Sequence, residues 1–213
     1  MAETGSDTEK GLLAHLALQH CDILTGVIPE PLLARAGVHR DWLLTLVKAF
    51  LDSRVGREVR TVAPQHVLRE ERFRCMLPGT AGTALVGVID MLYEHGDGWT
   101  IVEFKTGAPR RRTRELHLDQ TRVYACGLKH ERGLEVKAAV IAYLTAPESD
   151  WLQCTPQEAD VDLAEITNIA TAVSRQDFPA CPSRDRCAAC PFGGSGGICP
   201  ERYRQRKASH SIE

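Results

Sequence analysis

Two acidic residues and a lysine stand at a spacing that suits phosphodiester chemistry. Glu103 and Lys105 are two residues apart in a β-rich run, so their side chains point to the same face of a strand. A second β-rich run precedes them, and the turn signal at residues 95–98 joins the two runs into a hairpin. Asp90 then lies opposite Glu103 or opposite Lys105, depending on the register of the turn. In both registers the three side chains share one face.

This trio predicts metal-assisted hydrolysis of a phosphodiester. Mg²⁺ and Mn²⁺ prefer carboxylate oxygens, waters and phosphate oxygens as ligands. A bound cation lowers the pKa of a water ligand and offsets the charge of the transition state. Lys105 would orient that water, or neutralise the phosphorane, from a third position. The alternative is that Glu103 and Lys105 only pair with each other on a solvated face.

Several motifs surround the trio. They are Gly87-Val88-Ile89-Asp90, the run IVEFKTG at residues 101–107, Gln120 and Tyr124 one helical turn apart, and Gly37-Val38-His39 at the start of a long helix. Together they resemble the PD-(D/E)XK nuclease superfamily, and in particular its RecB- and AddB-like branch, which includes the small exonucleases of CRISPR adaptation. The resemblance runs from about Cys21 to Cys199 and implies a restriction-endonuclease-like core, a mixed sheet flanked by helices.

The resemblance also assigns roles to single residues. It implies that His39, Asp90 and Glu103 bind the metal and that Lys105 is the catalytic lysine, with the carbonyl of Phe104 as a further ligand. His39 has an alternative role as an ordinary first-turn helix residue.

Three more residues take roles from the family. Gln120 and Tyr124 share one helix face, which in the family lies against DNA beside the metal, although both could simply pack within the fold. Glu71 matches an additional acid that some members carry.

The end of the chain is rich in cysteine, glycine and proline. Cys187 and Cys190 form a CxxC motif, and Cys199 follows after eight intervening residues, which is typical of a metal site. The cysteine-bearing RecB-like nucleases hold a 4Fe–4S cluster with one N-terminal and three C-terminal cysteines, which implies Cys21 as the fourth ligand. Cys181 is the alternative fourth ligand, and a purely local site would suit Zn²⁺ equally well. The other three cysteines, Cys75, Cys126 and Cys154, are isolated and are expected to be small buried hydrophobes.

Arginines follow the second strand of the hairpin directly. Arg110, Arg111 and Arg112 are placed where guanidinium groups would hold phosphates beside the scissile bond, unless they form a solvated loop. A second basic run at residues 202–207 is expected to be a solvated tail. The sequence has no helix-turn-helix, zinc-finger or RNA-binding signature and no Gly-rich phosphate loop, so sequence-specific reading and ATP hydrolysis are not indicated.

The elements that must position these residues follow from hydrophobic periodicity. We expect helices over residues 12–21, 38–54, 113–129 and 163–175, and strands that end near Met76, flank the turn at 95–98 and span 134–144. This order predicts an α/β fold with a helical region at 1–58, a nuclease core at 59–178 and a cysteine-rich, metal-binding segment at 179–213 packed on the same domain.

Composition limits the possible functions. The 213 residues are 43% hydrophobic and 25% charged, and the net charge of −2 confines any site for nucleic acid to a local patch. No apolar run is long enough for a membrane span, and the polar start suggests no signal peptide, so a cytoplasmic protein is expected.

These features predict a Mg²⁺- or Mn²⁺-dependent DNA exonuclease that acts on single-stranded ends, with a possible helicase or integrase partner. The alternatives are a structure-specific endonuclease and a non-catalytic DNA-binding or assembly subunit of a CRISPR-adaptation or recombination complex.

Overall fold

The computed structural model describes residues 7–96, 98–108, 111–146 and 149–177, together with Ser183, Cys187, Cys190 and Cys199. The chain divides into two compact units, Met1–Asn168 and Ile169–Glu213. In the described part of the second unit, the Cys187 N–H donates to the Ser183 carbonyl at 2.9 Å. The first unit contains the sheet and all the elements that build the candidate site. No helix of the described residues has the length and apolar character needed to cross a bilayer.

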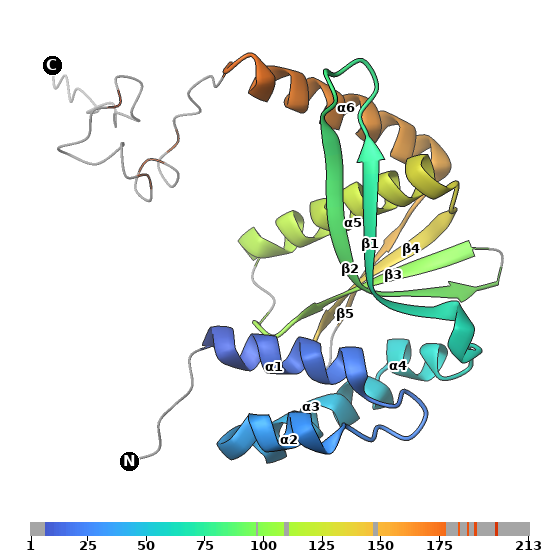
Figure 1. Cartoon of the computed structure of the whole chain (residues 1–213), viewed down its shortest axis with the longest axis vertical. Coiled ribbons are helices and arrows are strands. Elements are labelled where there is room, and N and C mark those ends of the chain that lie inside the picture. The colour runs from blue at the N-terminus through green and yellow to red at the C-terminus, as the bar shows by residue number, and fades with distance from the viewer. Residues whose placement is uncertain are drawn as a thin grey trace, which may run out of the picture. The chain divides into compact units, whose positions relative to one another are not determined.

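One mixed sheet forms the centre of the first unit (Figure 1). Its five strands lie in chain order: β1 (Val67–Met76), β2 (Ala84–His95), β3 (Gly98–Lys105), β4 (Val136–Tyr143) and β5 (Ser149–Gln153). Neighbouring strands are antiparallel except β3 and β4, which are parallel. Parallel neighbours require a crossover, and α5 (Arg111–Arg132) supplies it.

The N-terminal helices cover one face of the sheet. They are α1 (Asp7–His20), α2 (Glu30–Ala36), α3 (Arg40–Asp52) and α4 (Arg54–Val59), with the 3-10 turns η1 (Gly37–His39) and η2 (Pro64–His66) beside them. Their apolar side chains form a single core with Met91, Tyr93, Val102, Phe104 and Val140 of the strands. Phe50 of α3 packs edge-on against Phe104, with ring centroids 5.1 Å apart.

The opposite face packs against α5. Phe73, Ile89, Leu92 and Ile101 of the strands form a second core with Ala125 and Leu128 of that helix. The start of α6 (Pro156–Ser174) joins this layer, because Lys129 of α5 pairs with Asp160 at 2.6 Å. The fold of the first unit is therefore helices, sheet and helices, as the α/β prediction requires.

In strands β1 and β2, the alternation of side chains between the two faces of the sheet shifts by one residue at a single position. Val67 and Met91 belong to the core under the N-terminal helices, whereas Phe73 and Ile89 belong to the core under α5. In a regular strand, residues separated by an even number share a face, so both strands must be distorted in between. Glu70 lies there in β1 with a left-handed φ of 52°, opposite Asp90 in the register that the strands keep on both sides.

Past this distortion, residues 71–76 and 84–89 pair only with each other and form what we call the β1–β2 arm. The arm lies along α5 because the Phe73 ring fits against two glycines. A Cβ atom would come within 2.4 Å of this ring at Gly87 and within 2.2 Å at Gly127. Arg132 at the end of α5 pairs with Glu71 and donates to the carbonyl of Arg72, which fixes the base of the arm.

The sequence predicted most of these elements. Helices α1, α3, α5 and α6 and strands β1 to β4 lie where the periodicity placed them, and the turn has the register in which His95 faces Gly98. Three short elements, α2, α4 and β5, were not predicted. Pro31 lies in the first turn of α2, where the missing N–H of proline does no harm. The predicted regions 1–58, 59–178 and 179–213 remain predictions.

Candidate active site

Asp90 lies where β2 leaves β3. The last backbone pair between these strands is Met91 with Val102, and the next N–H, that of Phe104, donates to Oδ2 of Asp90 at 2.7 Å. The carboxylate thus takes the place of a strand carbonyl as the acceptor for this N–H. Its other oxygen, Oδ1, lies 2.9 Å from Nδ1 of His15 on α1. Both oxygens are held, so the carboxylate has a fixed orientation.

Glu103 is the most buried charged group of the site. Only 4% of the residue is exposed, and its Oε2 atom has no hydrogen-bond partner among the described residues. Burial, and then the nearby negative charge of Asp90, raise the pKa of Glu103 to about 7, although Lys105 opposes the shift. An unpaired buried carboxylate oxygen is costly unless something compensates its charge.

A polar network links Glu103 to α5. Nζ of Lys105 donates to Oε1 of Glu103 at 2.7 Å and to Oε1 of Gln120 at 3.2 Å. Nε2 of Gln120 donates in turn to Oε1 of Glu103 at 2.9 Å and to the Tyr124 hydroxyl at 2.6 Å. Gln120 and Tyr124 therefore lie on one helix face beside Lys105 and Glu103, and the contact with DNA that the family resemblance implies for them stays a prediction. Their contacts in this network are with Lys105, with Glu103 and with each other.

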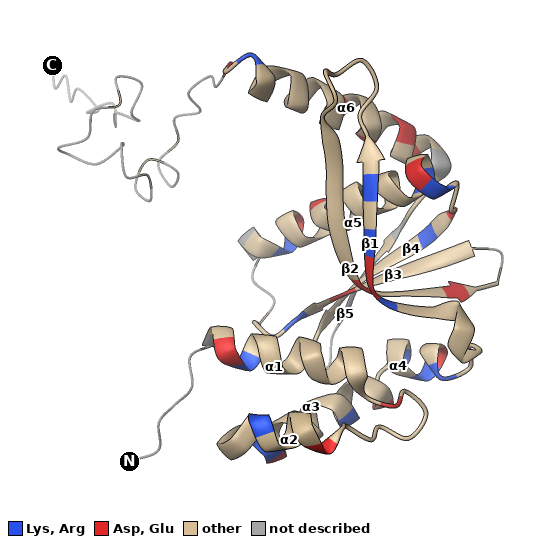
Figure 2. Ribbon diagram, in the orientation of Figure 1, with Lys and Arg blue, Asp and Glu red and all other residues tan. Residues whose placement is uncertain are grey.

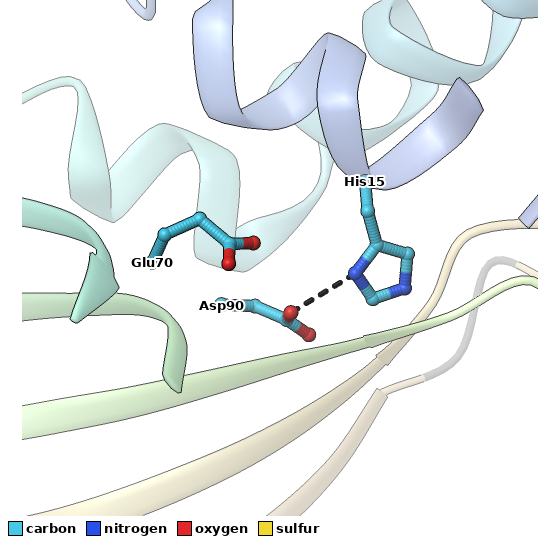
Figure 3. A group of neighbouring side chains, drawn as sticks. All are labelled: His15, Glu70 and Asp90. Carbon is cyan, nitrogen blue, oxygen red and sulfur yellow. Dashed lines mark hydrogen bonds and ion pairs between the residues drawn. The ribbon is translucent and has the colours of Figure 1, made fainter. Parts of the chain in front are cut away.

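A second group of ligand atoms lies on the side of Asp90 that faces α1. One atom each from His15, Glu70 and Asp90 lie within 4.8 Å of one another, and the three side chains converge (Figure 3). The hydrogen bond to Asp90 is the main cause that raises the pKa of His15. An imidazole nitrogen and carboxylate oxygens are ligands that Mn²⁺ and Mg²⁺ accept, so the residues present fit a divalent cation.

The position expected for His39 is occupied by His15. His39 ends η1, which contacts α2 and α3, and its ring packs edge-on against Trp42 at 6.4 Å. Helix α1 contacts β2, and a Cβ at Gly11 would meet the Thr106 hydroxyl beside Lys105 at 3.4 Å. The described contacts therefore bring His15, rather than His39, to Asp90, and the metal-binding role of His39 stays a prediction. His15 was missed because one sequence gives no signal for which helix crosses Asp90.

Glu70 was missed as well, and its neighbour Glu71 was predicted instead. Glu71 pairs with Arg132 of α5 and so belongs to the contact that fixes the arm. The left-handed backbone of Glu70 shifts the alternation of side chains by one position, which turns Glu70 toward Asp90. Strand periodicity alone would not reveal such a distortion.

The remaining predicted site residues are only partly described. Arg110 and the side chains of Arg111 and Arg112 lie outside the described residues, and so does Cys181. Cys21 is 2% exposed in the core of the first unit, and burial raises the pKa of its thiol. The three trailing cysteines, Cys187, Cys190 and Cys199, are half-buried in the second unit. The isolated cysteines are buried at Cys75 and Cys126 and half-buried at Cys154.

Comparison with known proteins places the chain in a family. Residues 2–200 match the PD-(D/E)XK nuclease superfamily, and the chain belongs to that superfamily. An ATP-dependent helicase/nuclease subunit from Heliobacterium modesticaldum is 27% identical over 168 residues, which is 65% of this chain and 12% of that protein. The helicase/nuclease subunit of the same name from Bacillus cereus (strain ZK / E33L) is 33% identical over 120 residues, 46% of this chain and 10% of that protein.

This chain thus spans about a tenth of the length of these curated relatives. A solved structure from Eubacterium rectale superposes with a TM-score of 0.48 at 11% identity, over 100% of this chain and 82% of that one.

Proposed function

We propose that this chain is a DNA nuclease that hydrolyses phosphodiester bonds with the help of Mg²⁺ or Mn²⁺. The observation that carries the proposal is the state of Glu103, a buried carboxylate with one oxygen unpartnered among the described residues, beside a second carboxylate. A divalent cation held by these residues would compensate both negative charges and lower the pKa of Glu103, so that this carboxylate is ionised at neutral pH. Membership of the PD-(D/E)XK superfamily supports this interpretation.

In the proposed site, His15, Glu70 and Asp90, whose ligand atoms lie within 4.8 Å of one another, would hold the cation, and Glu103 beside Asp90 would be a further ligand. When bound, the cation acts as a Lewis acid on the phosphate and lowers the pKa of a water ligand. Lys105 places its ammonium group beside Glu103, where it orients the attacking water and neutralises charge on the phosphate. Gln120 and Tyr124 hold Lys105 and Glu103 in place through their hydrogen bonds.

We further propose that the substrate is a single-stranded DNA end and that cleavage is exonucleolytic. This rests on the resemblance to RecB-like nucleases, and the relatives named helicase/nuclease favour a helicase as the partner that supplies such ends.

The nuclease proposal is tested with anaerobically purified protein and end-labelled single- and double-stranded DNA in Mn²⁺, Mg²⁺ or EDTA. We expect cation-dependent degradation that falls about 100-fold or more in Lys105→Ala, because the group that stabilises the transition state is lost. Lys48→Ala, on an exposed face of α3, is the matched control and should keep wild-type activity. The product ladder reports polarity and strandedness. A folded wild-type protein that cleaves none of these substrates would contradict the proposal and favour a role in DNA binding or assembly.

The cysteine-rich segment is proposed to hold a 4Fe–4S cluster through Cys187, Cys190 and Cys199, on the grounds of their spacing and of the RecB-like resemblance. The fourth ligand is Cys21 or Cys181. A brown protein with absorbance near ~400 nm and bound iron would support the cluster, and a colourless, zinc-loaded protein would overturn it. Comparing the iron content of Cys21→Ser and Cys181→Ser identifies the fourth ligand.

A further inference from the structure

The outer face of the β1–β2 arm carries two exposed arginines. Phe73 and Ile89 face α5, so residues of the other parity face away from it. On that outer face lie Arg72 and Arg74 of β1, both exposed. Figure 2 shows the positively charged positions of β1 in blue along its ribbon. Neither side chain makes an ion pair with any of the described residues. Exposed arginines are usually interpreted as protection of an edge strand, and β1 is an edge strand.

The residues opposite the two arginines argue for more than edge protection. Val86 pairs with Arg74 and Val88 pairs with Arg72, so all four side chains share one face. Val86 is 66% exposed and Val88 37%. Two charged groups in a row beside two exposed apolar groups match a single strand of nucleic acid, which offers phosphates along one side and bases along the other.

The row of exposed arginines and valines on the arm begins directly beside the candidate active site. Arg72 is two residues from Glu70, and Val88 is two residues from Asp90, a step of about 6.8 Å along a strand. Because the side-chain alternation shifts at Glu70 and Asp90, the outer face of the arm lies on the same side of the sheet as α1 and His15. A strand of DNA whose scissile phosphate lies beside Asp90 and His15 can therefore continue over the arm on the α1 side of the sheet.

The arm is also fixed in place. Phe73 is inserted between Gly87 and Gly127, and Arg132 holds Glu71 and the backbone of Arg72. A rigid arm presents its arginines without a large ordering cost when a ligand binds. The net charge of the chain is −2, so this local patch rather than the overall charge must attract a polyanion.

We propose that the outer face of the β1–β2 arm, formed by Arg72, Arg74, Val86 and Val88, is the track for the single-stranded DNA that extends from the scissile phosphate. The arginines bind its phosphates and the valines contact its bases. This inference rests on the proposed nuclease function and specifies the substrate contacts of that site.

The test measures binding of fluorescent oligothymidylates of 4 to about 20 nucleotides in Ca²⁺, over a range of salt concentrations. We expect Arg72→Gln/Arg74→Gln to weaken binding of the longest oligonucleotide at least tenfold, with a loss that grows with oligonucleotide length. The slope of log K against log salt should fall by about 1.4, because two phosphate contacts are lost and each is worth about 0.7 on a single strand. Val86→Thr/Val88→Thr should weaken binding and leave the slope unchanged.

The matched control is Arg35→Gln/Lys48→Gln, which removes two exposed positive charges from α2 and α3. Equal affinity and equal salt slope in the arm variant and this control would overturn the proposal. So would a wild-type dimer that the arm variant converts to a monomer, because the arm would then bind a second copy. Cleavage by the wild type is assayed separately in Mn²⁺. If the wild type cleaves DNA while the arm variant binds it normally, the arm inference alone has failed.

Discussion

Glu103 lies 4% exposed beside the carboxylate of Asp90, and its Oε2 atom has no partner among the described residues. Such an arrangement weakens the fold without metal and becomes favourable once a cation binds. Glu103→Gln removes the charge but keeps the shape of the side chain. At pH 8 in EDTA we therefore expect this variant to be more stable than the wild type by about 1 kcal/mol.

With saturating Mn²⁺, the order of stability should reverse, because binding to the native state stabilises the wild type and the variant has lost a ligand. Urea unfolding with and without Mn²⁺ measures both effects. Glu135→Gln, an exposed acid just before β4, serves as the control for charge removal. A Glu103→Gln protein that is less stable than the wild type in EDTA would show that the carboxylate is satisfied without metal.

Glu70 has a backbone conformation that glycine adopts without strain. Its φ of 52° costs an L-residue about 1–2 kcal/mol, which outweighs the extra freedom that glycine has in the unfolded chain. Both Glu70→Gly and Glu70→Ala remove the carboxylate, but only the first relieves the backbone. We expect the glycine variant to exceed the alanine variant in unfolding free energy by about 0.5–1 kcal/mol.

Chemical denaturation in EDTA measures this difference. Manganese titration of the same two proteins should show an equal loss of affinity in both, because the lost ligand is the same. If the alanine variant were as stable as the glycine variant, position 70 would not hold the left-handed conformation.

At the scale of elements, the arm depends on how closely it approaches α5. A Cβ added at Gly127 would lie 2.2 Å from the Phe73 ring, and the ring cannot yield because Gly87 lies on its other side. Gly127→Ala should therefore destabilise the protein by about 1–3 kcal/mol. Phe73→Leu makes room, so the double variant should lose less stability than the sum of the single losses. The unfolding free energies of the wild type, the two single variants and the double variant form a double-mutant cycle. Strictly additive losses would contradict the proposed contact between Phe73 and Gly127.

The elements also show what the sequence determines. The alternation of Glu103 and Lys105, the turn at residues 95–98 and the helical spacing of Gln120 and Tyr124 are local patterns, and the structure contains each of them. The chemical roles predicted for these residues stay predictions. His15 and Glu70 depend on non-local events: the packing of α1 over Asp90 and a left-handed residue within a strand. Periodicity carries no signal for either, so the site was predicted with His39 and Glu71 in their places.

At the scale of the whole molecule, two groups of carboxylates respond to pH in opposite ways. Hydrogen bonds and ion pairs lower the pKa values of several exposed acids, among them Asp22, Glu30, Asp52 and Asp160. Their contribution to stability is present above their unfolded pKa values of 3.8 to 4.5 and is lost as the pH falls. Glu103 behaves in the opposite way, because its folded pKa of about 7 lies above its unfolded value of 4.5.

Without metal, the native protein retains a proton on Glu103 between pH 4.5 and 7 that the unfolded chain has released, so the unfolding free energy falls across this window. The raised pKa of His15 acts in the same direction above pH 6.5. We therefore expect the stability in EDTA to rise with pH up to about 4.5 and to decline from there to about pH 7. Urea unfolding at fixed ionic strength across this range measures the curve, and Glu103→Gln should flatten the decline but not the rise. If the stability of the variant declined equally between pH 4.5 and 7, the decline would belong to another titrating group. In the wild type, saturating Mn²⁺ should abolish the decline, because the cation keeps Glu103 ionised.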